Sequence, residues 1–295
     1  MNKIVITRDS GIDPIDETNM ISYQIIRDNR DSFKDLIEIN NEQIIKELKE
    51  GHKFKTASPI LSDYHETFEN ILENGNDVLH LALGSGISEG GVNASNLIAS
   101  SLNAEYDNKV YVIDTMNGAT GGTLIDEYAK TLVNKGLSIK EIVSELNNFK
   151  HRIETSFYVP NPAGFIGSGR DKTELCTKEK VLLNGAKLAT KVGLKFRVNI
   201  NSEGNLYSES FMRAKTNIGM FKMLKSIINE ETIESYDPSY AVIGNVLEKD
   251  VNMTEVKEYI EGFKYFDKVI NKSINGVVAA YGSEDLCGIS LIKKI

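Results

Sequence analysis

Two glycine- and serine-rich segments, about thirty residues apart, combine residue types that could bind an anion. Residues 78–95 read VLHLALGSGISEGGVNAS and residues 110–123 read VYVIDTMNGATGGT. In each, an apolar strand pattern runs into a Gly/Ser loop and then into a helical pattern. Such a loop would bring Ser85, Ser88 and backbone N–H groups to a helix N-terminus, where unpaired donors and the helix dipole favour a phosphate or a carboxylate. Glycine and serine also serve ordinary tight turns, but two such loops together favour a ligand site.

Hydroxyl groups are better candidates than acidic groups for this site. Thr56, Ser85 and Ser88 all lie in predicted loops, and hydroxyls with backbone amides suit a carboxylate without adding charge. Asp114 ends the second strand and could act as a base or a metal ligand, although an Asx turn or a helix cap is the favoured interpretation. The sequence contains no GxSxG, GxxxxGK[ST] or complete GxGxxG motif, so it nominates no catalytic residue.

The remaining candidate metal ligands do not have the spacing of a metal site. The four histidines are His52, His65, His80 and His151, and the two cysteines are Cys176 and Cys287. His80 lies within an apolar strand pattern, which predicts a buried core residue, and the cysteines are expected to be buried thiols. We therefore predict no metal and no cofactor.

Composition excludes several classes of function. A net charge of −8 argues against a large nucleic-acid interface, and the lysines at 178–195 are typical of a solvated helix face. No apolar run approaches the ~20 residues that span a bilayer, and MNKIVITRDS reads as a first strand rather than a secretory signal. These features predict a cytoplasmic protein without an integral membrane segment.

The elements that must position these residues indicate an α/β protein of two domains. At 295 residues the chain exceeds the usual size of one core. Residues 1–153 predict an α/β/α layered domain with a mainly parallel sheet, whose ligands collect at the carboxyl ends of the strands. Residues 154–295 predict an α+β domain with antiparallel pairing, including a hairpin around Ser202-Glu203-Gly204-Asn205. The ligand is expected between the two domains.

Individual elements follow from hydrophobic periodicity and from cap residues. Strands are predicted at 3–7, 78–83, 110–114, 155–160, on both sides of the hairpin turn, 240–244, 276–281 and 288–292. Helices are predicted at 42–50, 65–75, 92–104, 120–135, 178–191, 214–229 and 254–265, with a further helix behind the capping box Ser138–Glu141. Residues 54–60 are expected to be irregular.

Several short motifs, in order, resemble those of a known family. Lys55-Thr56-Ala57-Ser58-Pro59 resembles a Lys-Thr-Ser-x-Pro motif, Ser85-Gly86-Ile87-Ser88 resembles a Ser-x-Leu-Ser loop, and Gly167-Ser168-Gly169-Arg170 resembles a Gly-Gly-Arg segment. With the glycine-rich turn after Asp114 and the stretch LLNGAKLATKVGLKFRVNINSEGNL, they occur in the order found in the DegV family of fatty-acid-binding proteins. The resemblance covers nearly the whole chain.

The resemblance implies that a long-chain fatty acid is buried between the two domains of a bacterial carrier that performs no reaction. Its carboxylate would be bound by Thr56 and Ser88, within a site that also includes Ser85, Gly86 and Tyr281. Arg170 and Arg213 would belong to a basic face toward a fatty-acid kinase, which phosphorylates the acid. A transient contact with a membrane surface is left open.

The chain also departs from the family pattern and leaves another reading open. Glu89-Gly90 follow Ser88 where the family has Gly-Thr, Ala57 replaces a serine, Tyr281 stands in a histidine position, and Glu284-Asp285 replace Pro-Gly. An α/β enzyme acting on a small phosphorylated or carboxylated metabolite is the alternative. Asp114 or Asp9 would then be its base, with Glu89 and Asp285 near a metal-assisted site. A third reading is a regulatory module whose cleft has lost its ligand.

Overall fold

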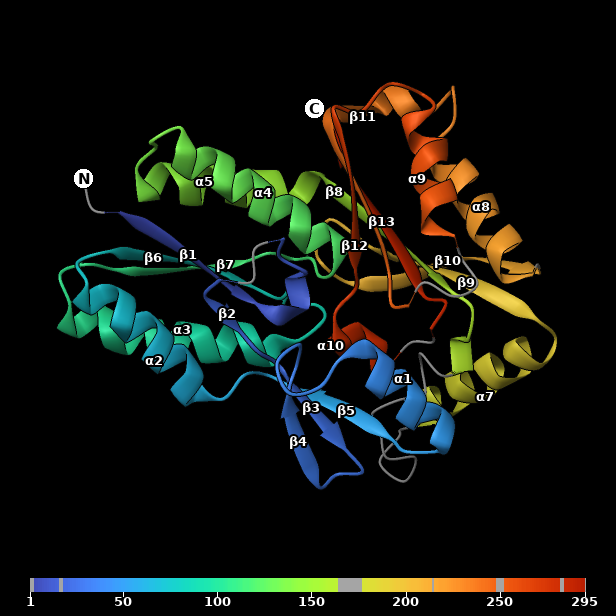
Figure 1. Cartoon of the computed structure of the whole chain (residues 1–295), viewed down its shortest axis with the longest axis horizontal. Helices are drawn as coiled ribbons and strands as arrows, with labels where there is room; N and C mark the ends of the chain where they lie inside the picture. The colour runs from blue at the N-terminus through green and yellow to red at the C-terminus, as the bar shows by residue number, and fades with distance from the viewer. Residues whose placement is uncertain are drawn as a thin grey trace.

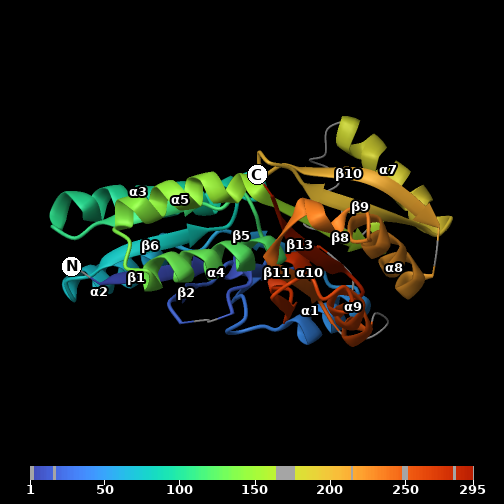
Figure 2. The same cartoon turned by 90° about the horizontal axis from the view of Figure 1, so that it is seen from above.

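The computed structural model contains three β-sheets and the helices that pack on them (Figure 1). It describes residues 3–15, 18–163, 177–213, 215–247, 252–281 and 284–294, with side chains omitted at 177–183, 209–213 and 216–217. Figure 2 shows the parallel sheet and its helices on one side of the molecule and the largest sheet on the other.

The first sheet is parallel throughout and confirms the predicted α/β half. Its strands, in spatial order, are β2 (Met20–Ile21), β1 (Ile4–Asp9), β6 (Asp77–Ala82) and β7 (Val110–Asp114). Two helices lie on one face, α2 (Leu61–Glu73) and α3 (Glu89–Glu105), and two on the other, α4 (Thr120–Asn134) and α5 (Ile139–Phe149) (Figure 1). Parallel strands need such helical crossovers, which cover both faces of the sheet.

The helix ends follow the local sequence closely. Ser138 and Glu141 form the predicted capping box at the start of α5. The side chain of Asn40 caps α1 (Asn41–Glu50), and Gly51 ends this helix in the left-handed conformation at φ 99°. Because such caps are local interactions, the sequence could predict the Ser138–Glu141 capping box.

The second sheet is a small antiparallel one that the sequence analysis missed. Its strands are β4 (Asp31–Lys34), β3 (Gln24–Arg27) and β5 (Phe54–Ala57). The prediction that residues 54–60 are irregular was wrong over β5, which is paired with β3 from Gln24 to Arg27. These strands are four residues each and rich in polar side chains, so they lack the alternation that identifies a strand.

The third sheet is mixed, mainly antiparallel, and begins where the second domain was predicted to begin. Its spatial order is β10 (Leu206–Arg213), β9 (Leu194–Ile200), β8 (Ile153–Val159), β13 (Cys287–Lys293), β11 (Tyr236–Asn245) and β12 (Lys268–Ser273). Only the β11–β12 pairing is parallel. Helices α7 (Thr177–Lys191), α8 (Thr216–Ile227) and α9 (Met253–Glu261) belong to this half. The predicted hairpin is confirmed as β9 and β10.

One predicted strand of this half is a helix. Residues 276–281 contain α10 (Gly276–Ala279), whose N-cap Asn275 accepts a hydrogen bond from Val278 N at 3.0 Å. A short apolar run such as Val277-Val278-Ala279 fits a buried strand or a buried helix equally well, so periodicity could not decide between them.

Strand β12 was missed because only Ile270 among its residues is buried.

A single hydrophobic cluster joins the two halves. It extends from Ile6 in β1 to Ile292 in β13, while two smaller clusters belong to one half each. Helix α4 packs against β1 as well as against β8, β11 and β13. The predicted boundary at residue 153 therefore coincides with a change of sheet but not with a break in the core.

Two buried carboxyl groups fasten α10 to the first half. Asp13 Oδ1 accepts from Asn275 N at 2.9 Å and from Asn275 Nδ2 at 2.6 Å. Asp35 Oδ1 accepts from Gly276 N at 3.0 Å, and Asp35 Oδ2 accepts from the Ser10 hydroxyl at 2.7 Å. Both carboxyls are almost completely buried. Burial raises the pKa of Asp13 to about 8 and the pKa of Asp35 to about 6.

These raised pKa values predict that stability falls as the pH rises toward 8. In the unfolded chain both groups titrate near 3.8, so between that value and the folded pKa the folded state holds protons that the unfolded state releases. Their contribution to stability is therefore complete below about pH 4 and is lost as the pH rises through 6 and then 8.

Asp13→Asn tests this prediction, because an amide keeps an oxygen for Asn275 and cannot ionise. Urea unfolding between about pH 6 and pH 8 should show a smaller decline for Asp13→Asn than for the wild type, which would lose up to about 1.4 kcal/mol per pH unit for each proton that differs. The exposed Asp107→Asn is the control and should follow the wild type. Identical slopes for all three proteins would contradict the prediction.

Candidate ligand-binding site

The predicted meeting of loops at the carboxyl ends of the parallel strands is present. Gly84 N donates to Asn117 O at 2.8 Å, which joins the first Gly/Ser loop to the second. Ala119 N donates to Gly11 O at 2.8 Å, which joins the second to the turn after β1. A Cβ on Gly84 would lie 2.6 Å from Asn117 N, so only glycine permits this approach.

Asp114 fastens the two loops and is not placed as a base. Its Oδ2 accepts from the Ser85 hydroxyl at 2.6 Å, and its Oδ1 accepts from Ser85 N at 3.0 Å and Met116 N at 2.9 Å. The favoured Asx-turn interpretation is confirmed by the bond from Met116 N. The Ser85 hydroxyl, predicted to contact a ligand, already has a partner, so it serves the loop.

Ser88 stands at the start of α3. It is the N-cap residue of this 17-residue helix and is half-buried, and its side chain makes no capping bond within the part of the chain that the structure describes. Helix α3 begins with Glu89, Gly90 and Gly91, so two of its first three residues have no side chain. This is the geometry in which a helix N-terminus can accept an anion.

Thr56 and Tyr281, two of the predicted ligand residues, touch each other. The Thr56 Oγ1 and Tyr281 Oη atoms lie 2.7 Å apart, and Thr56 N donates to the same phenol oxygen at 3.2 Å. Thr56 lies on β5 and Tyr281 follows α10. The Oγ of Ser58, two residues after Thr56, would be 3.2 Å from a Cβ on Gly90, so the segment that follows Thr56 contacts the first turn of α3.

The tip of the β9–β10 hairpin packs on both Gly/Ser loops. A Cβ on Gly86 would lie 2.3 Å from Gly204 O, and a Cβ on Gly204 would lie 3.1 Å from Met116. Gly86 is thus required for close contact between the halves, and it offers a backbone surface rather than a side chain. This hairpin contact was not foreseen, because nothing local in a turn sequence indicates what the turn packs against.

A buried polar layer lies behind the loops. Asp9 Oδ1 accepts from the Tyr64 hydroxyl at 2.8 Å, and Asp9 Oδ2 accepts from Leu83 N at 2.8 Å. His80 is completely buried, as predicted, and its Nδ1 lies 3.0 Å from the Thr7 hydroxyl. Because Asp9 is fully buried and holds two donors, it is a structural acceptor and is poorly placed to act as a base.

The side chains of the two predicted basic residues, Arg170 and Arg213, lie outside the part of the chain that the structure describes. Arg170 and Cys176 lie outside the described residues. Arg213 ends β10 opposite Leu194, and its side chain also lies outside them.

Cys287 is buried, as expected, and burial raises the pKa of its thiol. Within the described ranges, no group of three or more His, Cys, Asp or Glu residues could hold a metal ion.

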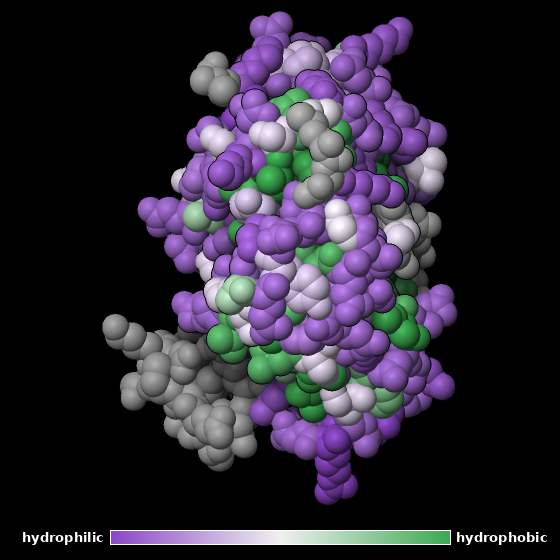
Figure 3. Space-filling view, turned by 90° about the vertical axis from the view of Figure 1, so that its left-hand side faces the viewer, coloured by the Kyte–Doolittle hydropathy of each residue, from purple (hydrophilic) through white to green (hydrophobic). Residues whose placement is uncertain are grey.

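The face shown in Figure 3 is mainly hydrophilic, with hydrophobic side chains in separate small areas. Among the described residues, no helix combines the length and the apolar character needed to cross a bilayer.

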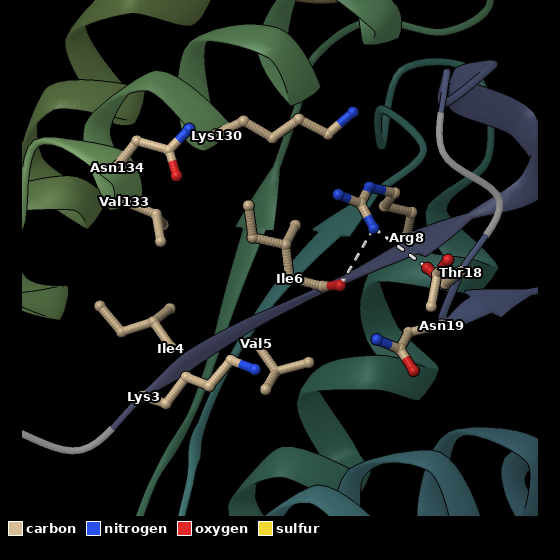
Figure 4. A pocket seen from close by; sticks show the side chains of 10 residues that line it. All are labelled: Lys3, Ile4, Val5, Ile6, Arg8, Thr18, Asn19, Lys130, Val133 and Asn134. Carbon is tan, nitrogen blue, oxygen red and sulfur yellow. Dashed lines mark hydrogen bonds between the residues drawn. The ribbon is translucent and has the colours of Figure 1, made fainter.

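A pocket of about 330 Å³ lies between the amino end of β1 and α4 (Figure 4). Two of its charged side chains are paired, since Arg8 Nε lies 2.5 Å from Asp126 Oδ1 and Lys130 Nζ lies 2.7 Å from Asp126 Oδ2. Arg8 also donates to Ile6 O at 3.1 Å, which covers part of the open edge of β1. The residues that line this pocket do not belong to the Gly/Ser loops, where an α/β sheet is expected to bind its ligand.

Comparisons with known proteins agree with this architecture. The family model described as "Uncharacterised protein, DegV family" matches residues 14–294. A DegV domain-containing protein of Staphylococcus aureus is 23% identical over 265 residues, which are 89% of this chain and 87% of the relative.

Two solved structures share the fold at low sequence identity. A DegV family protein from Thermus thermophilus, described by its fatty acid binding, has a TM-score of 0.81 at 19% identity and covers 99% of this chain and 100% of its own. The Streptococcus pneumoniae Fatty Acid Kinase (Fak) B3 protein, loaded with linoleic acid, has a TM-score of 0.79 at 18% identity with both chains covered completely.

One backbone conformation at this site can be tested directly. Ala119 has φ 48° and ψ −129°, a region that glycine adopts far more readily than alanine and that costs an alanine about 1–3 kcal/mol. Ala119→Gly should therefore be neutral or stabilising by up to about 1 kcal/mol after the entropy of glycine is counted. Ala129→Gly, a buried position in the middle of α4, should instead destabilise by about 1 kcal/mol or more.

Urea unfolding of the two variants and the wild type measures the difference. A loss of stability as large for Ala119→Gly as for Ala129→Gly would show that the conformation of Ala119 is not strained.

Proposed function

Because the chain belongs to the DegV family, we propose that it binds a long-chain fatty acid between its two halves and presents the carboxylate to a partner protein. The observation that carries this proposal is the Thr56–Tyr281 hydroxyl pair, next to a segment that contacts the first turn of α3 through Ser58. It joins residues from both halves of the chain at the end of the parallel sheet where a ligand is expected.

The site would hold a carboxylate with neutral donors. In the Thr56–Tyr281 pair one hydroxyl donates to the other, which leaves one O–H of the pair for a ligand. Ser88 supplies a second hydroxyl, and the first N–H groups of α3 add backbone donors and the positive end of a helix dipole. A carboxylate removed from water without such partners would be costly to bury.

The hydrocarbon chain would supply most of the affinity. Burying a sixteen-carbon chain at ~0.8 kcal/mol per methylene offers roughly 11–12 kcal/mol before association costs. A micromolar or tighter dissociation constant survives those costs. The headgroup contacts then decide that the ligand is an acid rather than another long-chain lipid.

The hydrogen bonds of the acidic side chains near the loops support a carrier that performs no reaction rather than an enzyme. Asp9 and Asp114, its candidate bases, accept hydrogen bonds that hold the loops together. Glu284, one of the acidic departures from the family pattern, lies 2.6 Å from Lys49 Nζ, so its charge is compensated. Glu89 is exposed at the start of α3. The enzyme reading therefore has little support from the geometry.

The partner is proposed to be a fatty-acid kinase. The support is the resemblance in fold to the Fatty Acid Kinase (Fak) B3 protein. A basic face containing Arg170 and Arg213 would attract an acidic surface on the kinase or the phosphate of its nucleotide. A transient contact with a membrane surface would let the acid enter and leave. The protein is proposed to act in the cytoplasm, where such a kinase has its nucleotide.

Native mass spectrometry and two headgroup variants test the proposed function. We expect the purified protein to retain a mass that matches a C14–C18 acid. Ser88→Ala and Thr56→Val should each weaken palmitate binding by about 5- to 10-fold, because each removes a hydrogen bond worth roughly 1 kcal/mol or more. Fluorescence displacement or calorimetry measures the dissociation constants.

Ser100→Ala is the matched control, since its hydroxyl bonds to Asn96 O on the exposed side of the same helix. It should bind palmitate like the wild type. A wild-type protein that retains and binds no fatty acid would overturn the proposal. A stoichiometric phosphate ester or metal in the mass spectrum would favour the enzyme reading instead.

A further inference from the structure

The hydroxyl of Tyr23 is buried under the first turn of α3. Tyr23 immediately precedes β3 and is 1% exposed. Within the part of the chain that the structure describes, its Oη makes no hydrogen bond of ordinary geometry. A buried phenol that lacks a partner is unfavourable, and such groups in a native structure usually have a reason.

The hydroxyl is directed at the N-terminus of α3. A Cβ on Gly91 would lie 2.2 Å from Tyr23 Oη and 3.3 Å from Asp9 Oδ2, so a glycine is needed for the phenol to reach this position. Ser88, the N-cap residue, lies three residues before Gly91. Burial and then the charge of Asp9 raise the pKa of the Tyr23 phenol, and a smaller contribution from the Ser88 side chain, which lies beside the phenol, lowers it.

The neighbouring acceptors leave Ser88 as the natural partner. Asp9 accepts from Tyr64 and from Leu83 N, and Tyr23 Oη makes no hydrogen bond to it in the described residues. Since its pKa is raised well above its usual range, the Tyr23 phenol remains protonated and can only be a donor or a neutral acceptor. The Ser88 side chain, in contrast, makes no capping bond within the described residues.

We propose that Tyr23 is a positioning residue for the headgroup site, whose hydroxyl donates to Ser88 Oγ and so directs the Ser88 proton toward the bound carboxylate. The proposal rests on the proposed function. In this chain of hydrogen bonds each donor strengthens the next, and the terminal oxygen carries a negative charge only when the ligand is an acid. Tyr23 would therefore favour acids over neutral lipids of the same length.

Tyr64 provides a matched comparison. It is also a fully buried tyrosine in this layer, but its hydroxyl already donates to Asp9 Oδ1 at 2.8 Å. Tyr64→Phe removes a hydrogen bond that the fold uses. Tyr23→Phe removes a hydroxyl that makes no hydrogen bond of ordinary geometry in the described part of the chain. A structural role and a role in ligand recognition thus predict different results for the two variants.

The experiment measures the binding of palmitate and of hexadecanol to the wild type, Tyr23→Phe and Tyr64→Phe, together with thermal unfolding. Tyr23→Phe should weaken palmitate binding about 5-fold, as expected for one hydrogen bond of roughly 1 kcal/mol. It should leave hexadecanol binding within about 2-fold and the unfolding midpoint unchanged or higher. Tyr64→Phe should lower the midpoint and leave the ratio of the two dissociation constants unchanged.

An unchanged palmitate-to-hexadecanol ratio in Tyr23→Phe would overturn the role of Tyr23 while the proposed function stands, provided that the wild type binds palmitate. A wild type that binds no palmitate would overturn both. A lower midpoint with an unchanged ratio would show that the Tyr23 hydroxyl is structural only.

Discussion

The arrangement of the site depends on the hydrogen bonds that join α10 to the first half of the chain. Asp13 and Asp35 accept the N–H groups of Asn275 and Gly276, and Tyr281 follows this helix directly. Without those two carboxyls the start of α10 would present unpaired donors in a buried place, at a cost for each group. With them, Tyr281 is brought against Thr56 from the other end of the chain.

The acidic side chains near the loops serve geometry more than chemistry. Asp9, Asp13, Asp35 and Asp114 each accept at least two hydrogen bonds from backbone, hydroxyl or side-chain amide donors. Acceptors of this kind hold turns that have no regular structure of their own. The hydroxyls of Thr56, Tyr281 and Ser88 are left as candidates for binding, and they suit an acidic ligand because they are neutral donors.

The two halves share one core, which affects how a ligand could lie between them. The hairpin tip at Gly204 touches both Gly/Ser loops, and α4 packs on both large sheets. Binding a long apolar chain in such an interface replaces protein contacts with ligand contacts, so the ligand and the fold stabilise each other. This coupling would make stability depend on whether the site is occupied.

The sequence by itself determined the elements with strong local patterns. These are the parallel strands β1, β6 and β7, the helices with capping boxes or glycine stops, the hairpin, and the loop residues Thr56 and Ser88 as candidates. Only the tertiary structure decided that Ser85 is bound by Asp114, that Tyr281 meets Thr56 across 225 residues, and that the Tyr23 hydroxyl reaches Gly91. The tertiary structure also decided the conformation of the short polar strands and of the four-residue helix α10, because that conformation depends on partners distant in sequence and not on local periodicity.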